Sequence, residues 1–318
     1  MKLYGRSQQQ RAAAIGFGLL LALLAGHLAW DIHERDAFSW MDPVQYYQAA
    51  SAIAKGGSLS GFVVATLYPV LLGAILALHD SIPVALGVHS LWLIALGAGW
   101  WFICRRMDLG FWAAPGLLAL LAGPAMFGLS RELYLEFPLT ALAVAWYAVW
   151  RHRGENACPH HAIYLGLLMA SGFALKMTFP VFLAGPIALE ALDALRRRDG
   201  LALQQAAWTL LLPIAAVMAL LYLFFPGMFQ YYLSIGNTEI PPMRLIGPPE
   251  TMSWAAAGFY PWHIVRNYIG WLGLFLLPLL ALTWPFRRGG FDRQRLELWL
   301  WALVPIAVFT WKIGRAHV

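Results

Sequence analysis

The sequence has little charge and almost no cysteine. Only 12% of its 318 residues are charged, about half the share found in soluble domains. Both cysteines, Cys104 and Cys158, fall on the cytoplasmic side of the membrane topology predicted below, so we expect no disulfide. The chain lacks a P-loop, and its Gly16-Phe17-Gly18 has no strand before it, so we expect no nucleotide-binding fold.

Apolar sequence is what the chain has in abundance, at 60% of its residues. The apolar runs recur along the whole length and approach the roughly 20 residues that cross a bilayer as a helix. Sixteen Trp and twelve Tyr are typical of the aromatic belts at membrane interfaces. The net charge of +6 does not indicate a nucleic-acid partner, because the basic residues cluster at the ends of apolar runs. The sequence therefore predicts an all-α polytopic membrane protein.

Charge placement predicts the topology. We expect nine spans, at residues 12–30, 82–104, 110–128, 133–150, 162–175, 179–195, 203–225, 263–286 and 296–311. The first is expected to be an uncleaved signal anchor. Segment 62–78 is expected to lie at the outer interface or to re-enter, since a crossing there would put Arg105 and Arg106 outside. Two long external loops result, at 31–61 and 226–261.

The last six residues, 313–318, read IGRAHV. This is the translation of a stretch of a common sequencing-adapter oligonucleotide, and the preceding adapter bases fit a Lys312 codon. We expect the reading frame to run into adapter sequence, so that residues 1–312 are a C-terminally truncated membrane module. A genuine short tail is the alternative.

Two acidic residues are the candidate catalytic groups. Asp42 precedes Pro43 in the first external loop, and with Gln45 three residues later it fits a helix N-cap. A functional carboxylate is an equal alternative, and one residue can do both. Glu136 is expected about one turn into an inbound apolar helix, where an acid is costly unless it faces a cavity or a cation.

Basic residues on the external side need a reason other than topology. Arg131, Lys176 and Arg266 are candidate ligands for the phosphate of a membrane lipid, which Arg binds with two hydrogen bonds and Lys as a point charge. For Lys176 the alternative is snorkelling to the interface. The histidines at 79 and 89 are expected to be satisfied polar residues rather than ligands, and no structural zinc set is present.

These features together resemble the polytopic GT-C glycosyltransferases, in particular the branch of protein O-mannosyltransferases and aminoarabinose lipid A transferases. The likeness lies in the signal anchor, the acidic first loop, Tyr68-Pro69, and the Ser-Arg-…-acid-x-Pro-Leu start of the helix at 133. Pro43 and Gln45 stand where the family often has Glu and Arg.

The resemblance implies a residue for each role. Asp42 takes the place of the first-loop catalytic aspartate and Tyr46 that of the following Tyr. Glu136 takes that of the acid before Pro-Leu, and Lys176 that of a Lys after the fifth span.

The implied activity is inverting transfer of a sugar from a polyprenyl-phosphate donor to a lipid, protein or glycan acceptor, on the periplasmic face of the inner membrane. Membrane lipid is the implied surrounding partner. A divalent cation near Glu136 is the one cofactor considered. The alternatives are a flippase of lipid-linked sugars, an oligosaccharide polymerase or ligase, and a non-catalytic membrane protein.

Overall fold

The described part of the chain is helical, apart from one short pairing of strands. The structure is a computed structural model and describes residues 2–33, 35, 37–38, 41–57, 67–107, 109–121, 124–152, 159–224, 226, 229–230, 286–287, 290–291, 293, 296–297 and 300. The fold is therefore all-α over these residues, as the sequence predicts.

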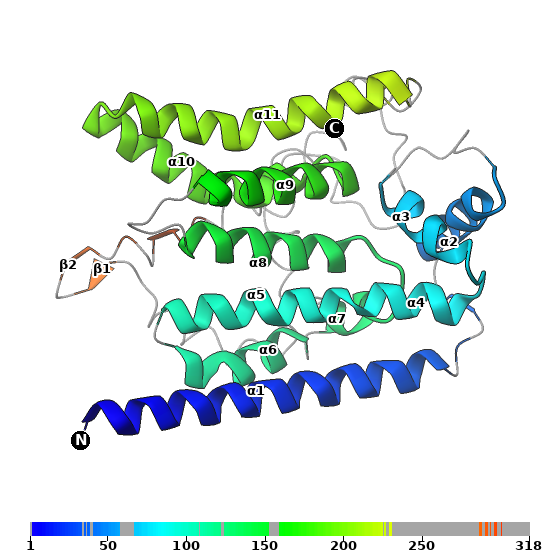
Figure 1. Ribbon diagram of the computed structural model, residues 1–318, viewed down its shortest axis with the longest axis horizontal. Coiled ribbons are helices and arrows are strands. Elements are labelled where there is room, and N and C mark those ends of the chain that lie inside the picture. Colours follow the sequence, from blue (N-terminus) through cyan, green and yellow to red (C-terminus); the bar gives the residue numbers. More distant parts are fainter. Residues whose placement is uncertain are drawn as a thin grey trace, which may run out of the picture. The chain divides into compact units, whose positions relative to one another are not determined.

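The helices follow one another with short connections (Figure 1). They are α1 Lys2–His33, α2 Met41–Ala54, α3 Leu67–Leu76, α4 Ile82–Ser90, α5 Trp92–Arg106, the 3-10 turn η1 Gly110–Trp112, α6 Ala113–Leu121, α7 Pro124–Leu129, α8 Glu136–His152, α9 Pro159–Leu175, α10 Phe179–Arg197 and α11 Gly200–Phe224. The strands β1 Phe286–Arg287 and β2 Gly290–Phe291 pair antiparallel, with Phe286 opposite Phe291.

Three of the described helical segments are long and apolar enough to cross a membrane. They are Gln8–His33, Ile82–Arg106 and Ala207–Phe224, which correspond to the predicted spans 12–30, 82–104 and 203–225. The other six spans stay predictions, and nearly all of 263–286 and 296–311 lies outside the described residues. At about 1.5 Å per residue, α3 is about 15 Å long; residues 62–66 of the predicted interfacial segment lie outside the described residues, so its placement stays a prediction.

Within the predicted span 110–128 the structure describes the turn η1, α6 up to Leu121 and α7 from Pro124, and residues 122–123 lie outside the described residues. One predicted boundary is wrong, and proline explains it. The inbound helix begins at Glu136 rather than at 133. Pro138 then stands in the first turn, where backbone N–H groups have no helical partner in any case.

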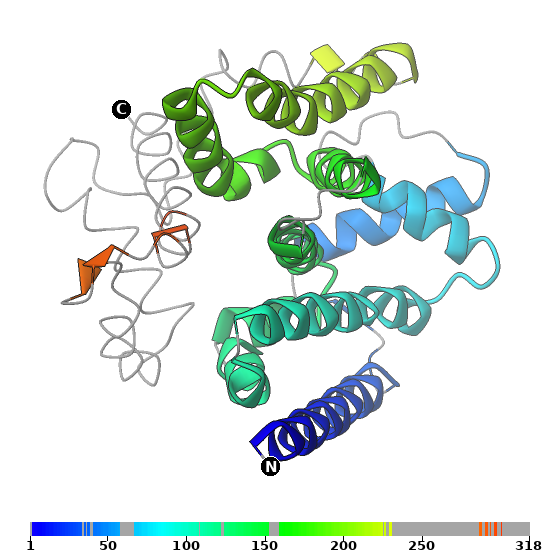
Figure 2. The ribbon, with the colours of Figure 1, turned by 60° about the vertical axis from the view of Figure 1, so that its left-hand side comes forward.

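The chain forms two compact units, and the first holds the candidate site. It comprises residues 1–122 and 126–177, in which α5 packs on α8, α8 on α9, and α1 against α4, α5 and α6. Figures 1 and 2 show these long helices side by side, with α2 and α3 beside one end of the stack. A Cβ on Gly99 would meet Val144 Cγ1 at 3.0 Å, so glycine allows the close approach of α5 to α8.

Short helix α2 is held tightly against α3. A Cβ on Gly73 would lie 2.8 Å from the carbonyl oxygen of Ala50, so any larger residue there would force the two helices apart. The expected external loop at 31–61 is therefore largely ordered as helix at its centre, and α1 also extends three residues into it, to His33. The second unit comprises residues 123–125 and 178–318, in which α10 packs on α11.

Candidate functional site

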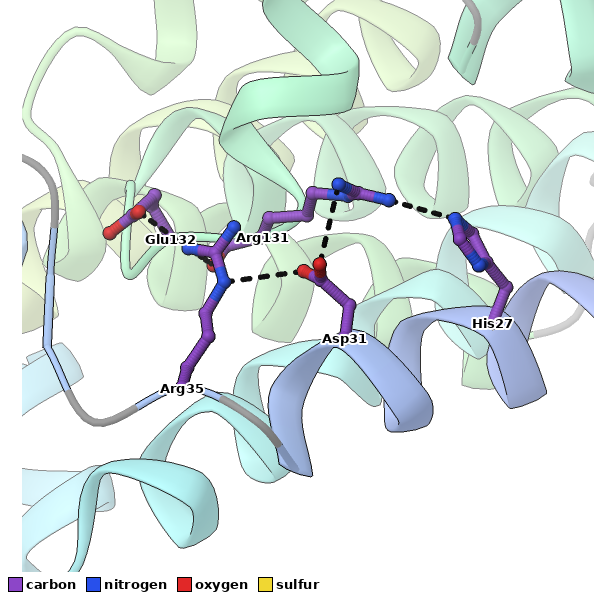
Figure 3. A network of polar contacts seen from close by, with 5 residues as sticks. All are labelled: His27, Asp31, Arg35, Arg131 and Glu132. Carbon is purple, nitrogen blue, oxygen red and sulfur yellow. Dashed lines mark hydrogen bonds and ion pairs between the residues drawn. The ribbon is translucent and has the colours of Figure 1, made fainter.

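A chain of alternating charges joins the end of α1 to the segment between α7 and α8 (Figure 3). Glu132 Oε1 accepts a hydrogen bond of 2.6 Å from Arg35 Nη1, and Arg35 Nε lies 3.3 Å from Asp31 Oδ2. On its other side Asp31 Oδ1 lies 3.5 Å from Arg131 Nη1, and Arg131 donates to His27 Nε2 at 2.8 Å. The Glu132 side chain is only 6% exposed, so its ion pair with Arg35 anchors the segment between α7 and α8 by a buried contact.

Arg131 is thus held by a carboxylate of its own chain. Its side chain is 17% exposed and faces Asp31 and His27. Because arginine only donates hydrogen bonds, His27 Nε2 must be an unprotonated acceptor in this arrangement. Arg131, the predicted phosphate ligand, therefore has its guanidinium engaged in this network.

Glu136 and Lys176, predicted to share the site, form an ion pair. Lys176 Nζ donates to Glu136 Oε1 at 2.6 Å, and the two side chains are 40% and 37% exposed. Glu136 is the first residue of α8 and Lys176 follows the last residue of α9, so each charge also complements its helix dipole. Of the two expected surroundings for this acid, a cavity or a cation, the structure shows the cation, although Glu136 lies at the start of α8 rather than one turn into it.

Asp42 lies on the surface near the start of α2. The helix begins at Met41, so Asp42 is in its first turn and the predicted N-cap position is wrong by about two residues. Its residue is exposed, and among the described residues no hydrogen bond or ion pair holds its carboxylate. The carboxylate is therefore open to other groups at the surface.

The negative charges of three acids from two parts of the chain act on Tyr134. Partial burial, and then the charges of Asp42, Glu132 and Glu136 in that order, raise the pKa of its hydroxyl to about 12. Coulomb interactions fall off with distance, so all three carboxylates lie within electrostatic reach of one phenol. Asp42 and Glu136, distant in sequence, therefore both lie in the electrostatic surroundings of Tyr134.

No family model, curated protein or solved structure matches this chain. Function must therefore be argued from the residues, the geometry and the motif resemblance.

The remaining predicted residues have mixed outcomes. Tyr46 is 7% exposed and packs edge-on against Tyr68 at a ring-centroid distance of 6.2 Å, so its ring belongs to the buried core. Arg266 lies outside the described residues. Among the described residues no three His, Cys, Asp or Glu side chains are grouped to hold a metal ion. His89 is a satisfied polar residue, as predicted, bonded to Tyr68 and to the Leu129 carbonyl.

Sequence reasoning missed Arg35 and Tyr134. Arg35 lies in the predicted first external loop, and the test that singled out Arg131 and Lys176, a basic residue on the external side, would also have found it. Tyr134 carries no comparable signal, since one tyrosine among twelve is ordinary for an interface.

A second cluster that was missed ties α2 to the turn before α4. Asp80 accepts hydrogen bonds from Ser51 Oγ at 2.6 Å and Tyr47 Oη at 2.9 Å, and its Oδ2 lies 2.9 Å from Lys55 Nζ. The hydrogen bonds from Ser51 and Lys55 lower the pKa of Asp80 to about 2. Tyr47 and Ser51 lie four residues apart on one face of α2, and Lys55 follows directly after the helix, so this cluster orients the helix that carries Asp42.

Proposed function

We propose that the chain is a membrane glycosyltransferase that moves a sugar from a polyprenyl-phosphate donor to an acceptor hydroxyl at the periplasmic face of the inner membrane. The observation that carries the proposal is the exposed ion pair of Glu136 and Lys176, with the exposed Asp42 in the same unit and within electrostatic reach of the same Tyr134. The motif resemblance to GT-C enzymes supports the same reading. Three helices of the length and composition to cross a membrane fit a substrate with a long apolar tail.

Asp42 is the proposed general base. Its carboxylate is exposed and has no cation partner among the described residues, so an acceptor hydroxyl can approach it. By contrast Glu132 is buried against Arg35, and Glu136 is neutralised by Lys176. Of the three acids, Asp42 is therefore the one suited to take a proton from an acceptor.

The proposed reaction is a single displacement. Asp42 accepts the proton of the acceptor hydroxyl as its oxygen forms a bond to the anomeric carbon. The bond from that carbon to the phosphate oxygen breaks with inversion, and polyprenyl phosphate leaves with the electron pair. A base positioned in this way contributes about 10²–10⁴-fold to the rate.

Lys176 is the proposed phosphate ligand. Its ammonium is more than a third exposed, so a phosphate can approach it from solvent. Because Glu136 already holds the lysine side chain in one conformation, binding of the phosphate costs little further side-chain entropy. Charge on the leaving phosphate grows in the transition state, and a fixed cation stabilises that charge more than it stabilises the ground state. Arg131 adds positive potential from within its network.

The test is release of polyprenyl phosphate. The full chain is reconstituted in liposomes with mannosyl- or aminoarabinosyl-phosphoryl polyprenol and a lipid A or hydroxyl-peptide acceptor, and lipid products are quantified by mass spectrometry. The proposal expects acceptor-dependent release that Asp42→Asn lowers at least about 10²-fold. Asp199→Asn, an exposed acid in the second unit, is the matched control. Movement of intact donor across the bilayer without release would identify a flippase instead.

A further inference from the structure

His89 touches both ends of the segment that carries the site. It lies on α4 with no exposed surface, and its Nε2 is 3.0 Å from the carbonyl oxygen of Leu129, the last residue of α7. Its ring also packs against Phe137, the second residue of α8, at a centroid distance of 5.4 Å. The residues between these two contacts, 130–136, include Glu132, Tyr134 and Glu136.

The hydrogen bonds of His89 define its tautomer. A carbonyl oxygen only accepts, so Nε2 carries the proton and donates it to Leu129. In a buried ring without a counter-charge the neutral form is favoured, so Nδ1 is an acceptor and takes the hydrogen bond of 2.6 Å from the Tyr68 hydroxyl. Both ring nitrogens are therefore engaged, and the ring has a single orientation.

Tyr68 continues this connection to the helix that carries Asp42. It is 3% exposed on α3, and Tyr46, one turn after Asp42 on α2, packs edge-on against it. The close contact of Gly73 with Ala50 holds α2 and α3 together at a neighbouring turn. A continuous series of buried contacts thus runs from α2 through Tyr68 and His89 to both flanks of segment 130–136.

We propose that His89 is a positioning residue that sets the spacing between Asp42 and Glu136. It touches neither acid, and it acts through the Leu129 carbonyl on one side and Tyr68 on the other. The expected effect on sugar transfer rests on the proposed function, whereas the effect on spacing does not. The two are therefore measured separately.

Spacing is measured between spin labels at Gln48 and Gly128, in the full chain with Cys104 and Cys158 replaced by Ala. Gln48 is exposed on α2, and a side chain on Gly128 meets nothing within 4 Å. His89→Phe keeps the ring but removes both hydrogen bonds, and it should broaden and shift this distance. A control pair at Gln48 and Leu71 spans only α2 and α3 and should not change.

Transfer kinetics supply the second readout. His89→Phe should lower kcat about 10²-fold while the KM for the donor lipid stays unchanged, because the acids are displaced rather than removed. His89→Gln, whose amide can both donate to the carbonyl and accept from Tyr68, should restore most of the loss. Tyr68→Phe, which removes one bond, should fall between them and serves if His89→Phe does not fold.

Unchanged distances in His89→Phe would overturn the proposal, whether or not transfer is lost. Broadened distances with wild-type kcat would overturn it as well, since the spacing would not matter to the reaction. If the wild-type chain transfers no sugar, the proposed function fails, and the distances alone decide whether His89 sets the spacing.

Discussion

Separating the Glu136–Lys176 ion pair is predicted to cost much activity and little stability. The perturbation is a double-mutant cycle of Glu136→Gln, Lys176→Met and the two combined. Both side chains remain more than a third exposed, so solvent screens the pair strongly although Nζ and Oε1 are only 2.6 Å apart. This exposure is what allows the two effects to be told apart.

The magnitude follows from that geometry. In a water-like dielectric two unit charges 2.6 Å apart attract by about 1.6 kcal/mol. Holding two long side chains in one arrangement offsets part of this attraction, and exposed pairs typically contribute about 0.2–1 kcal/mol. Each single variant should therefore lower the unfolding temperature in detergent by no more than about 4 °C.

Activity should respond quite differently. Loss of a fixed charge at the leaving phosphate costs about 10²–10³-fold in kcat when it is removed from a preorganised site. Because Glu136 holds Lys176 in place, the two act as a unit, and the double variant should lose about as much as either single one. Initial rates of polyprenyl phosphate release and thermal unfolding, measured in the same detergent, check both parts.

Two results would refute the reasoning. Multiplicative losses of kcat in the double variant would mean that the two residues act independently. A fall of unfolding temperature well beyond a few degrees, with activity lost in proportion to folded protein, would show that the pair is structural.

Three further predictions concern the neighbouring acids. Glu132→Ala should destabilise the chain by about 3 kcal/mol, far more than Glu136→Ala. The Glu132 side chain is only 6% exposed, and its removal takes the 2.6 Å partner from the partly buried Arg35 guanidinium. Thermal unfolding of the two variants compares them directly. Asp80→Asn should cost about 1–2 kcal/mol, measured the same way, through weaker bonds to α2. Because the folded-state pKa of Asp80 is lowered to about 2, its contribution to the free energy of unfolding is complete above pH of about 4 and is lost as pH falls towards 2. The unfolding free energies of wild type and Asp80→Asn, measured over a pH series, should therefore converge near pH of about 2. A constant difference between the two curves would contradict the assignment.

Hydrophobic length and charge placement predicted the helical class and much of the helix positions. The end of α9 at Leu175 and the start of α10 at Phe179 agree with the predicted spans, because apolar runs and flanking charges define them in the sequence itself. The pairing of Glu136 with Lys176 was also within reach. An acid near an apolar run is costly unless it faces a cavity or a cation, and lysines on the predicted external side are few.

The rest depended on tertiary contacts that leave no local pattern. The charge network of Arg35 and Glu132 joins residues 97 positions apart, and no periodicity relates them. The start of α8 at Glu136 rather than at 133 was missed because the apolar run already begins at Leu133, although Pro138 is suited to the first turn of a helix. The role of His89 is equally non-local, since its partners come from three other helices.

The most direct test of the account is the rate at which purified wild-type chain and Asp42→Asn, in matched nanodiscs, convert a polyprenyl-phosphate sugar and an acceptor into glycosylated acceptor. The account predicts measurable transfer by the wild type with an inverted anomeric product, and a loss of at least about 10²-fold in the variant. Equal rates for the two proteins would contradict the assigned role of Asp42, and no glycosylated acceptor from the wild type would contradict the transferase itself.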